Sequence, residues 1–242
     1  MTLDYLLDSA NWALTSPDGF PQRILEHLGY TLLSLAIAAV IAFPIGLLIG
    51  HTGRGALIAI NLGNAGRALP TLGVLMLALG LVGIGLVPVM IALVVLAIPP
   101  VLATTYAGVR SVADETVDAA RGVGMSEAQI AWRVEVPIAL PIIIGGLRNA
   151  SLQVVSTATI AAYAGLGGLG RYLFDGLATL QYDQVVAGAI VLAALAVAID
   201  LGLAGIQRLL VSPGVDGRSA GSRPPTATST TAATEAEPAT AS

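Results

Sequence analysis

The 242-residue chain has no cysteine, only two histidines and few charged side chains. Without cysteine, disulfides and thiolate metal sites are excluded. Charged residues make up 11% of the chain, whereas a soluble domain carries roughly 25%. Asp4 and Asp8 stand where a cleavable signal peptide would carry basic residues, so no such peptide is expected. The low share of charged residues therefore argues against a soluble domain.

Apolar residues fill most of the chain instead, at 55% of the residues and a mean hydropathy of +0.83. Five apolar stretches are long enough for a helix to cross the hydrocarbon core, which takes about 20 residues. The 28 glycines fit this class, since small residues let membrane helices approach closely. We therefore predict an all-α membrane protein with about five transmembrane helices, at roughly 24–50, 56–81, 87–109, 138–163 and 184–210.

The composition divides the chain into three parts. In residues 1–23, leucines and Trp12 stand among acidic residues, which predicts a short helix at the membrane surface, with a flexible leader as the equal alternative. Residues 24–211 form the membrane domain. Residues 212–242 are rich in Ser, Thr, Ala and Pro and cannot bury a core, which predicts a disordered tail.

One long polar segment, residues 112–137, interrupts the apolar stretches. A first helix is predicted from about 114 to 121, because acidic residues near a helix start are favoured by its dipole. Two glycines then end it, since glycine takes the left-handed conformation of a C-cap. A capping box, Ser126 with Gln129, begins a second helix that runs toward Pro137, where proline blocks continuation. The acids near the start of the first helix are Asp114, Glu115 and Asp118, and the two glycines are Gly122 and Gly124.

This segment resembles the cytoplasmic loop of permease subunits of ABC importers. The family pattern is EAA, three residues, Gly, nine residues, Ile, any residue, Leu and Pro. Here Asp118-Ala119-Ala120 is followed after three residues by Gly124, and nine residues later comes Val134-Glu135-Val136-Pro137. The spacing matches throughout, while Asp replaces Glu and Val replaces both Ile and Leu.

The resemblance implies a MetI-like permease fold whose loop docks into a cleft of a separate ATPase subunit. The chain has no GxxxxGK[ST] motif, so ATP would bind to that partner and no cofactor to this chain. A second permease subunit, identical or different, and an extracytoplasmic solute-binding protein complete the implied assembly in the bilayer; no nucleic acid is expected. The implied ATPase-coupling residues are Glu115, Asp118, Ala119, Ala120, Gly122, Gly124 and Pro137.

Polar side chains within the apolar stretches are the candidates for a transport path. They gather in the fourth stretch, where they either line the path or hydrogen-bond between helices. Arg67 is placed near the cytoplasmic end of its span, as an anchor or, alternatively, a pathway residue. Asp200 is expected to pair with an arginine or to face water. The candidates for lining the path are Asn149, Gln153, Ser156, Thr157 and Thr159.

The arginines predict the orientation of the chain. If residues 112–137 are cytoplasmic, seven arginines lie on that side and two on the other, which obeys the positive-inside rule. The chain is then a multi-pass plasma-membrane protein with its N-terminus outside and its C-terminus in the cytoplasm. The seven are Arg54, Arg110, Arg121, Arg133, Arg208, Arg218 and Arg223, and the two are Arg23 and Arg171.

The substrate is indicated by the segment AYAGLGGLGRYLFDGLA at 162–178. It resembles the outer segment of permeases for glycine betaine, carnitine, choline and proline, which implies import of such an osmoprotectant. Methionine or another amino acid is the alternative. An ion-coupled secondary transporter is a further, less favoured alternative, because such transporters need intramembrane acids and only Asp200 qualifies here. A membrane enzyme would need clustered histidines or acids, and His27 and His51 stand at separate span ends.

Overall fold

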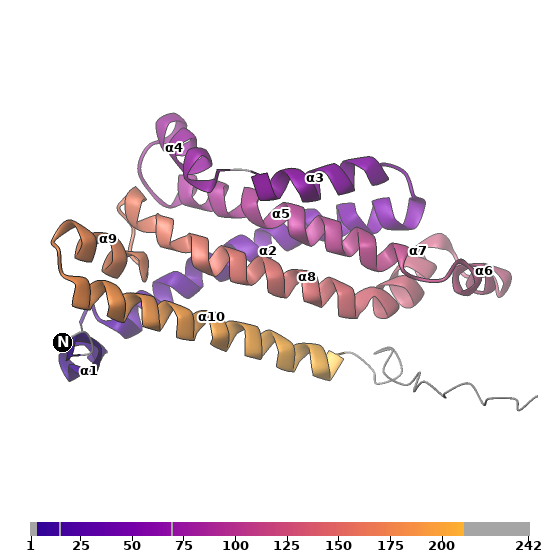
Figure 1. The fold of residues 1–242 in the computed structure, drawn as a ribbon. Coiled ribbons are helices and arrows are strands. Elements are labelled where there is room, and N and C mark those ends of the chain that lie inside the picture. Colours follow the sequence, from indigo (N-terminus) through magenta and orange to yellow (C-terminus); the bar gives the residue numbers. More distant parts are fainter. Residues whose placement is uncertain (1–3, 15, 69, 211–242) are drawn as a thin grey trace, which may run out of the picture.

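In the part of the chain that the structure describes, four helical segments are long and apolar enough to cross a membrane: α2 (Phe20–Thr52), α5 (Leu86–Arg110), the continuous helix Glu127–Ala164, and α10 (Tyr182–Leu210). They coincide with the first, third, fourth and fifth predicted spans. The computed structural model describes residues 4–14, 16–68 and 70–210, and no strand occurs among them (Figure 1). The predicted tail, 212–242, lies outside the described residues. The all-α membrane class is confirmed.

The remaining helices are short and lie at the ends and on one side of the bundle (Figure 1). We call the end that holds the 112–137 segment the loop end, and the opposite end, which holds the glycine-rich 162–178 segment, the glycine end. The short helices are α1 (Asp4–Leu7), a 3₁₀ turn (Ser9–Trp12), α3 (Ala56–Ala68), α4 (Thr71–Val82), α6 (Asp114–Gly122), α7 (Glu127–Ile130) and α9 (Gly170–Ala178).

The second predicted span is two helices rather than one. Pro70 separates α3 from α4, because proline has no N–H to donate and disfavours a helical conformation in the residue before it. The first of the two helices, α3, packs along α5 with Ala59 fully buried. Arg67 therefore lies in the last turn of α3, away from the loop end, which corrects its predicted position (Figure 1). Its side chain lies outside what the structure describes.

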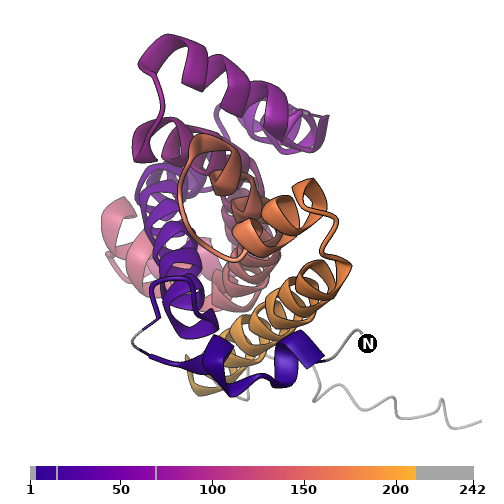
Figure 2. The same cartoon turned by 90° about the vertical axis from the view of Figure 1, so that its left-hand side faces the viewer.

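Close contacts between α2, α5 and α8 (Val136–Thr157) form the centre of the bundle. Glycines permit this approach: a Cβ at Gly146 would lie 1.8 Å from Thr104 Oγ1, and one at Gly50 would lie 2.7 Å from Val109 Cβ. Such contacts are how membrane helices gain packing energy. Seen from the glycine end, α3 and α4 lie on one side of this centre and α10 on the other (Figure 2).

Aromatic rings dock the N-terminal segment onto the glycine end. The ring centroids of Trp12 and Phe20 are 4.9 Å apart, and those of Phe20 and Tyr172 are 4.6 Å apart. The Trp12 indole N–H donates to the carbonyl of Leu6 at 2.7 Å. The short helix predicted here is present, and these contacts join it to α2 and α9.

Candidate functional site

The first helix of the loop, α6, ends in a Schellman motif. Gly124 has φ +85°, its N–H donates to the Arg121 carbonyl at 2.9 Å, and the Met125 N–H donates to the Ala120 carbonyl at 3.1 Å. Glycine takes this left-handed conformation without the steric cost that other residues meet. Gly122 is the last helical residue. Of the two glycines predicted to end the helix, Gly124 supplies the left-handed turn.

The second helix begins with the predicted capping box. The Ser126 N–H donates to Gln129 Oε1 at 2.9 Å, and the Gln129 N–H donates to Ser126 Oγ at 3.4 Å. The helix does not end at Pro137, so that prediction is wrong. A π-helical turn, Ala131–Glu135, precedes the proline and runs directly into α8. The wider turn accommodates a ring that would clash with the carbonyl four residues earlier.

The predicted coupling residues divide into a covered and an exposed set. Ala120 is buried inside the hairpin, where it joins a small apolar cluster with Val117 and Ile130. This cluster holds α6 against α7. The remaining predicted residues are exposed at the loop end and stay candidates for contact with a partner: Glu115, Asp118, Ala119, Gly122, Gly124 and Pro137.

Charged side chains connect the two loop helices. Arg121 Nη1 lies 3.0 Å from Asp118 Oδ1, and Arg121 Nε lies 2.8 Å from Glu127 Oε1. The hydrogen bond to Glu127 raises the pKa of the Arg121 guanidinium above its ordinary value. Asp118, the first residue of the family-like motif, is thus paired within its own helix.

The same charged chain reaches the loop end of α2 through His51. His51 Nε2 lies 3.0 Å from Glu127 Oε2, and His51 Nδ1 lies 2.8 Å from Glu135 Oε2. Sequence reasoning missed this contact, because Glu135 is 84 residues away from His51 in the chain. The signal available in the sequence was a histidine at the predicted end of a span.

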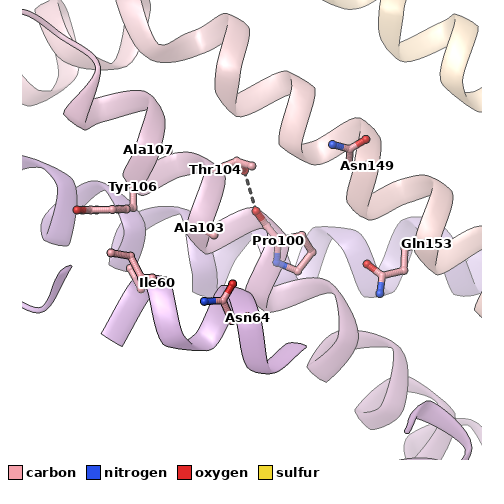
Figure 3. Close-up of a pocket in the computed structure, with 10 residues that line it drawn as sticks. Ile60, Asn64, Pro100, Ala103, Thr104, Tyr106, Ala107, Asn149 and Gln153 are labelled. Atoms are coloured by element: carbon pink, nitrogen blue, oxygen red, sulfur yellow. Dashed lines mark hydrogen bonds between the residues drawn. The ribbon is translucent and has the colours of Figure 1, made fainter. Parts of the chain in front are cut away.

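A cavity of about 430 Å³ lies between α3, α5 and α8 (Figure 3). Each helix contributes uncharged polar groups to its wall: Asn64 from α3, Thr104 and Tyr106 from α5, and Asn149 and Gln153 from α8. The Thr104 hydroxyl donates to the carbonyl of Pro100 at 2.8 Å.

Two of the five predicted path residues, Asn149 and Gln153, line this cavity. Ser156, Thr157 and Thr159 are not among its lining residues. The hydroxyl of Ser156 donates to the Leu152 carbonyl at 3.0 Å, and that of Thr159 donates to the Ser156 carbonyl at 2.9 Å. The structure therefore separates the five candidates into a cavity pair and three residues nearer the glycine end.

Asp200 on α10 pairs with Arg148 on α8. Pairing with an arginine was one of the two environments predicted for it, and facing water was the other. Two hydrogen bonds form this contact, from Arg148 Nε to Oδ1 at 2.9 Å and from Nη2 to Oδ2 at 2.8 Å. Arg148 also donates to Gln207 Oε1 at 3.3 Å. The contact ties α10 to α8 and occupies both oxygens of the carboxylate.

The glycine-rich segment rests on the start of α2. The Gly168 N–H donates to Glu26 Oε2 at 2.7 Å, and Arg23 Nη1 lies 2.9 Å from the same oxygen. Gly168 has φ +90°, and a Cβ at Gly167 would lie 1.9 Å from Glu26 Oε2. The glycines therefore allow the backbone of this segment, which helices flank on both sides, to lie close against α2.

A family model described as the inner membrane component of binding-protein-dependent transport systems matches residues 23–212. The chain belongs to this family. The permease is 34% identical over 193 residues to the choline transport system permease protein OpuBB of Bacillus subtilis, covering 80% of this chain and 89% of that one. It is 33% identical over 192 residues to the glycine betaine/carnitine/choline transport system permease protein OpuCB of the same organism, covering 79% and 88%.

The fold of the permease is also that of a solved ABC importer. An inward-facing structure of the MetNI methionine ABC transporter aligns with a TM-score of 0.69 at 21% identity, covering 87% of this chain and 98% of that chain. This likeness confirms the predicted MetI-like fold. The permease is thus a multi-pass transport subunit.

Proposed function

We propose that this permease forms one half of the membrane channel of an ATP-driven importer for an osmoprotectant such as choline, glycine betaine, carnitine or proline. The observation that carries the proposal is the identity of 33–34%, over about four fifths of the chain, to permeases named for choline, glycine betaine and carnitine. Methionine is the alternative substrate, and its support is likeness of fold to the methionine importer.

The cavity between α3, α5 and α8 is our candidate for this permease's share of the path. A trimethylammonium group has no N–H to donate, so oxygen dipoles and aromatic faces hold it. Amide oxygens of Asn149 and Gln153 and the ring of Tyr106 offer such groups. A wall without charge would bind the cation weakly enough to release it, as a path must. A second permease subunit would close the cavity from the other side.

The α6–α7 hairpin is our candidate for the ATPase contact, with the loop end in the cytoplasm and the N-terminus outside. Its Schellman motif and capping box keep the hairpin rigid by satisfying backbone groups at both helix ends. Exposed small residues, Ala119 and Gly122 among them, allow close approach of a cleft. A separate ATPase subunit hydrolyses ATP, and a solute-binding protein delivers the substrate.

The test is uptake by proteoliposomes that hold the permease with its own ATPase and binding protein. Radiolabelled choline, glycine betaine, carnitine, proline and methionine are offered separately, with and without enclosed ATP. We expect ATP-dependent uptake of at least one osmoprotectant and none of methionine. Uptake of methionine alone would overturn the substrate proposal, and uptake that follows an ion gradient without ATP would overturn the importer class.

A further inference from the structure

His51 occupies a place that the proposed coupling does not explain. It stands at the last turn of α2, with its two ring nitrogens 3.0 Å and 2.8 Å from the carboxylates of Glu127 and Glu135. The side chains of His51 and Glu135 are only 13% and 6% exposed. One imidazole thus joins three elements of the loop end: α2, the start of α7, and the π-helical turn.

With both carboxylates ionised, the hydrogen bonds of this bridge depend on the protons that the ring carries. A neutral imidazole has one N–H donor and one acceptor nitrogen, whereas an ionised carboxylate only accepts. Both nitrogens can therefore donate only when the ring is an imidazolium. A neutral ring would turn a lone pair toward one carboxylate and lose that hydrogen bond. The bridge in this form is complete only while His51 carries two protons.

The two carboxylates depend on His51 unequally. Glu127 is also neutralised by Arg121, whose Nε lies 2.8 Å from its other oxygen, and it is 57% exposed. Among the ion pairs of the described residues, Glu135 has His51 as its only cationic partner. Leaving a buried carboxylate without its partner is costly. The His51–Glu135 contact is therefore the stronger fastening of the two.

We propose that His51 is a positioning residue for transport. Its imidazolium fastens the loop end of α2 to both ends of the α7 and π-turn segment, so that a loop displaced by the ATPase carries α2 with it as well as α8. The proposal rests on the proposed function. The groups that face the ring are Glu127 from α7 and Glu135 from the π turn, with Arg121 of α6 behind Glu127.

The first test measures the fastening without transport. Because the chain has no cysteine, Thr52→Cys and Val123→Cys place one spin label on the end of α2 and one at the loop tip. Double electron–electron resonance of the full-length permease in nanodiscs should give one narrow distance distribution. His51→Gln should broaden this distribution, because the ring that joins the two carboxylates is then missing.

The second test measures transport in the assembled importer, as choline or glycine betaine taken up per ATP hydrolysed. His51→Gln should lower this ratio about tenfold, as expected from loss of a charge-assisted hydrogen bond. The double variant His51→Gln/Glu135→Gln leaves no unpaired buried carboxylate. It should recover wild-type protein yield but keep the lowered ratio.

The matched control is Asp175→Asn, which breaks the exposed Arg171–Asp175 pair of 3.0 Å at the glycine end and should change neither measurement. A distance distribution that His51→Gln leaves unchanged overturns the proposal. So does a normal ratio of uptake to hydrolysis in His51→Gln. If the wild-type importer moves none of the offered ligands, the proposed function fails, while the resonance measurement still decides whether His51 fastens the loop.

Discussion

The loop end and the central cavity both hold polar side chains in a mostly apolar molecule, but they use them in opposite ways. At the loop end, charged groups pair with one another, from Asp118 through Arg121 and Glu127 to His51. In the cavity the polar groups are neutral, and no hydrogen bond among the described side chains involves the amides of Asn149 or Gln153. Paired charges make a rigid part, whereas unpaired amides can receive a ligand.

The two regions also differ in how the chain builds them. The hairpin of α6 and α7 is local, because its turn, caps and most of its ion pairs lie within about twenty consecutive residues. The cavity is assembled from three helices that are far apart in sequence and meet through close glycine contacts. Changes in helix packing should therefore damage the cavity and spare the hairpin, and the following predictions separate them.

The largest effect is expected from Gly146→Ala, in the wall between α5 and α8. The added Cβ would lie 1.8 Å from Thr104 Oγ1 and 2.3 Å from Thr104 Cβ, so the helices must separate. Overpacking of this kind costs about 1–3 kcal/mol, which corresponds to a melting temperature lowered by roughly 2–12 °C. Melting in detergent measures this loss. Co-purification with the ATPase, which reports on the hairpin, should persist.

The neighbouring glycine provides the control for that change. Gly145 is on the same helix, and a Cβ there meets nothing within 4 Å. Gly145→Ala should therefore melt like the wild type. Equal melting of the two variants would show that the contact of Gly146 with Thr104 does not hold the cavity wall.

An intermediate effect is expected from Gly124→Val at the loop tip. A Cβ at Gly124 meets nothing within 4 Å, so the cost comes only from its φ of +85°. For a residue other than glycine that cost is about 1–2 kcal/mol, which should reduce ATPase co-purification and uptake about tenfold. Melting of the membrane helices should stay unchanged.

Gly122→Ala is the matched variant for the loop tip. Gly122 is helical, and nothing lies within 4 Å of its added Cβ. Alanine is favoured over glycine in a helix, so this variant should bind the ATPase at least as well as the wild type unless Gly122 itself lies against the cleft. Co-purification that is lost in Gly122→Ala and kept in Gly124→Val would reverse our assignment of the two glycines.

The smallest effect is expected from Gln153→Leu in the cavity. The change removes one amide and keeps a similar volume, so it should raise the KM for uptake about fivefold, the loss of roughly one hydrogen bond or dipole contact. The ATPase rate without substrate should not change. Ser156→Ala is the comparison, because the Ser156 hydroxyl bonds to its own helix. Equal KM values in the two variants would remove the cavity from the path.

Local features of the sequence were sufficient to predict much of this molecule. The apolar stretches gave the long helices, the Ser126 capping box marked the start of α7, and Gly124 marked the turn, since each depends on residues a few positions apart. The pairing of Asp200 with an arginine was one of two expected outcomes, and an arginine on a neighbouring helix decided it.

Features that depend on long-range packing could not be predicted. The α3–α4 break left Arg67 away from its expected place, because packing along α5 decided where α3 lies. His51 finds Glu135 only after α2 and α8 pack together. The passage of the helix through Pro137 needed a π turn, which the usual rule for proline does not include. Of the five predicted path residues, only Asn149 and Gln153 line the cavity. This follows from how α8 is rotated against α3 and α5.

The π turn before Pro137 has a mechanical consequence. It makes α7 and α8 parts of one rod of 38 residues, Glu127–Ala164, and at 1.5 Å per residue such a rod is roughly 57 Å long. A sideways push on its loop end tilts the whole rod by about 1° for each ångström of travel. Had the helix stopped at Pro137, a flexible joint there would absorb the same push. The rod passes Asn149 and Gln153 on its way to the glycine end, so a tilt about that end would move the cavity wall together with the loop.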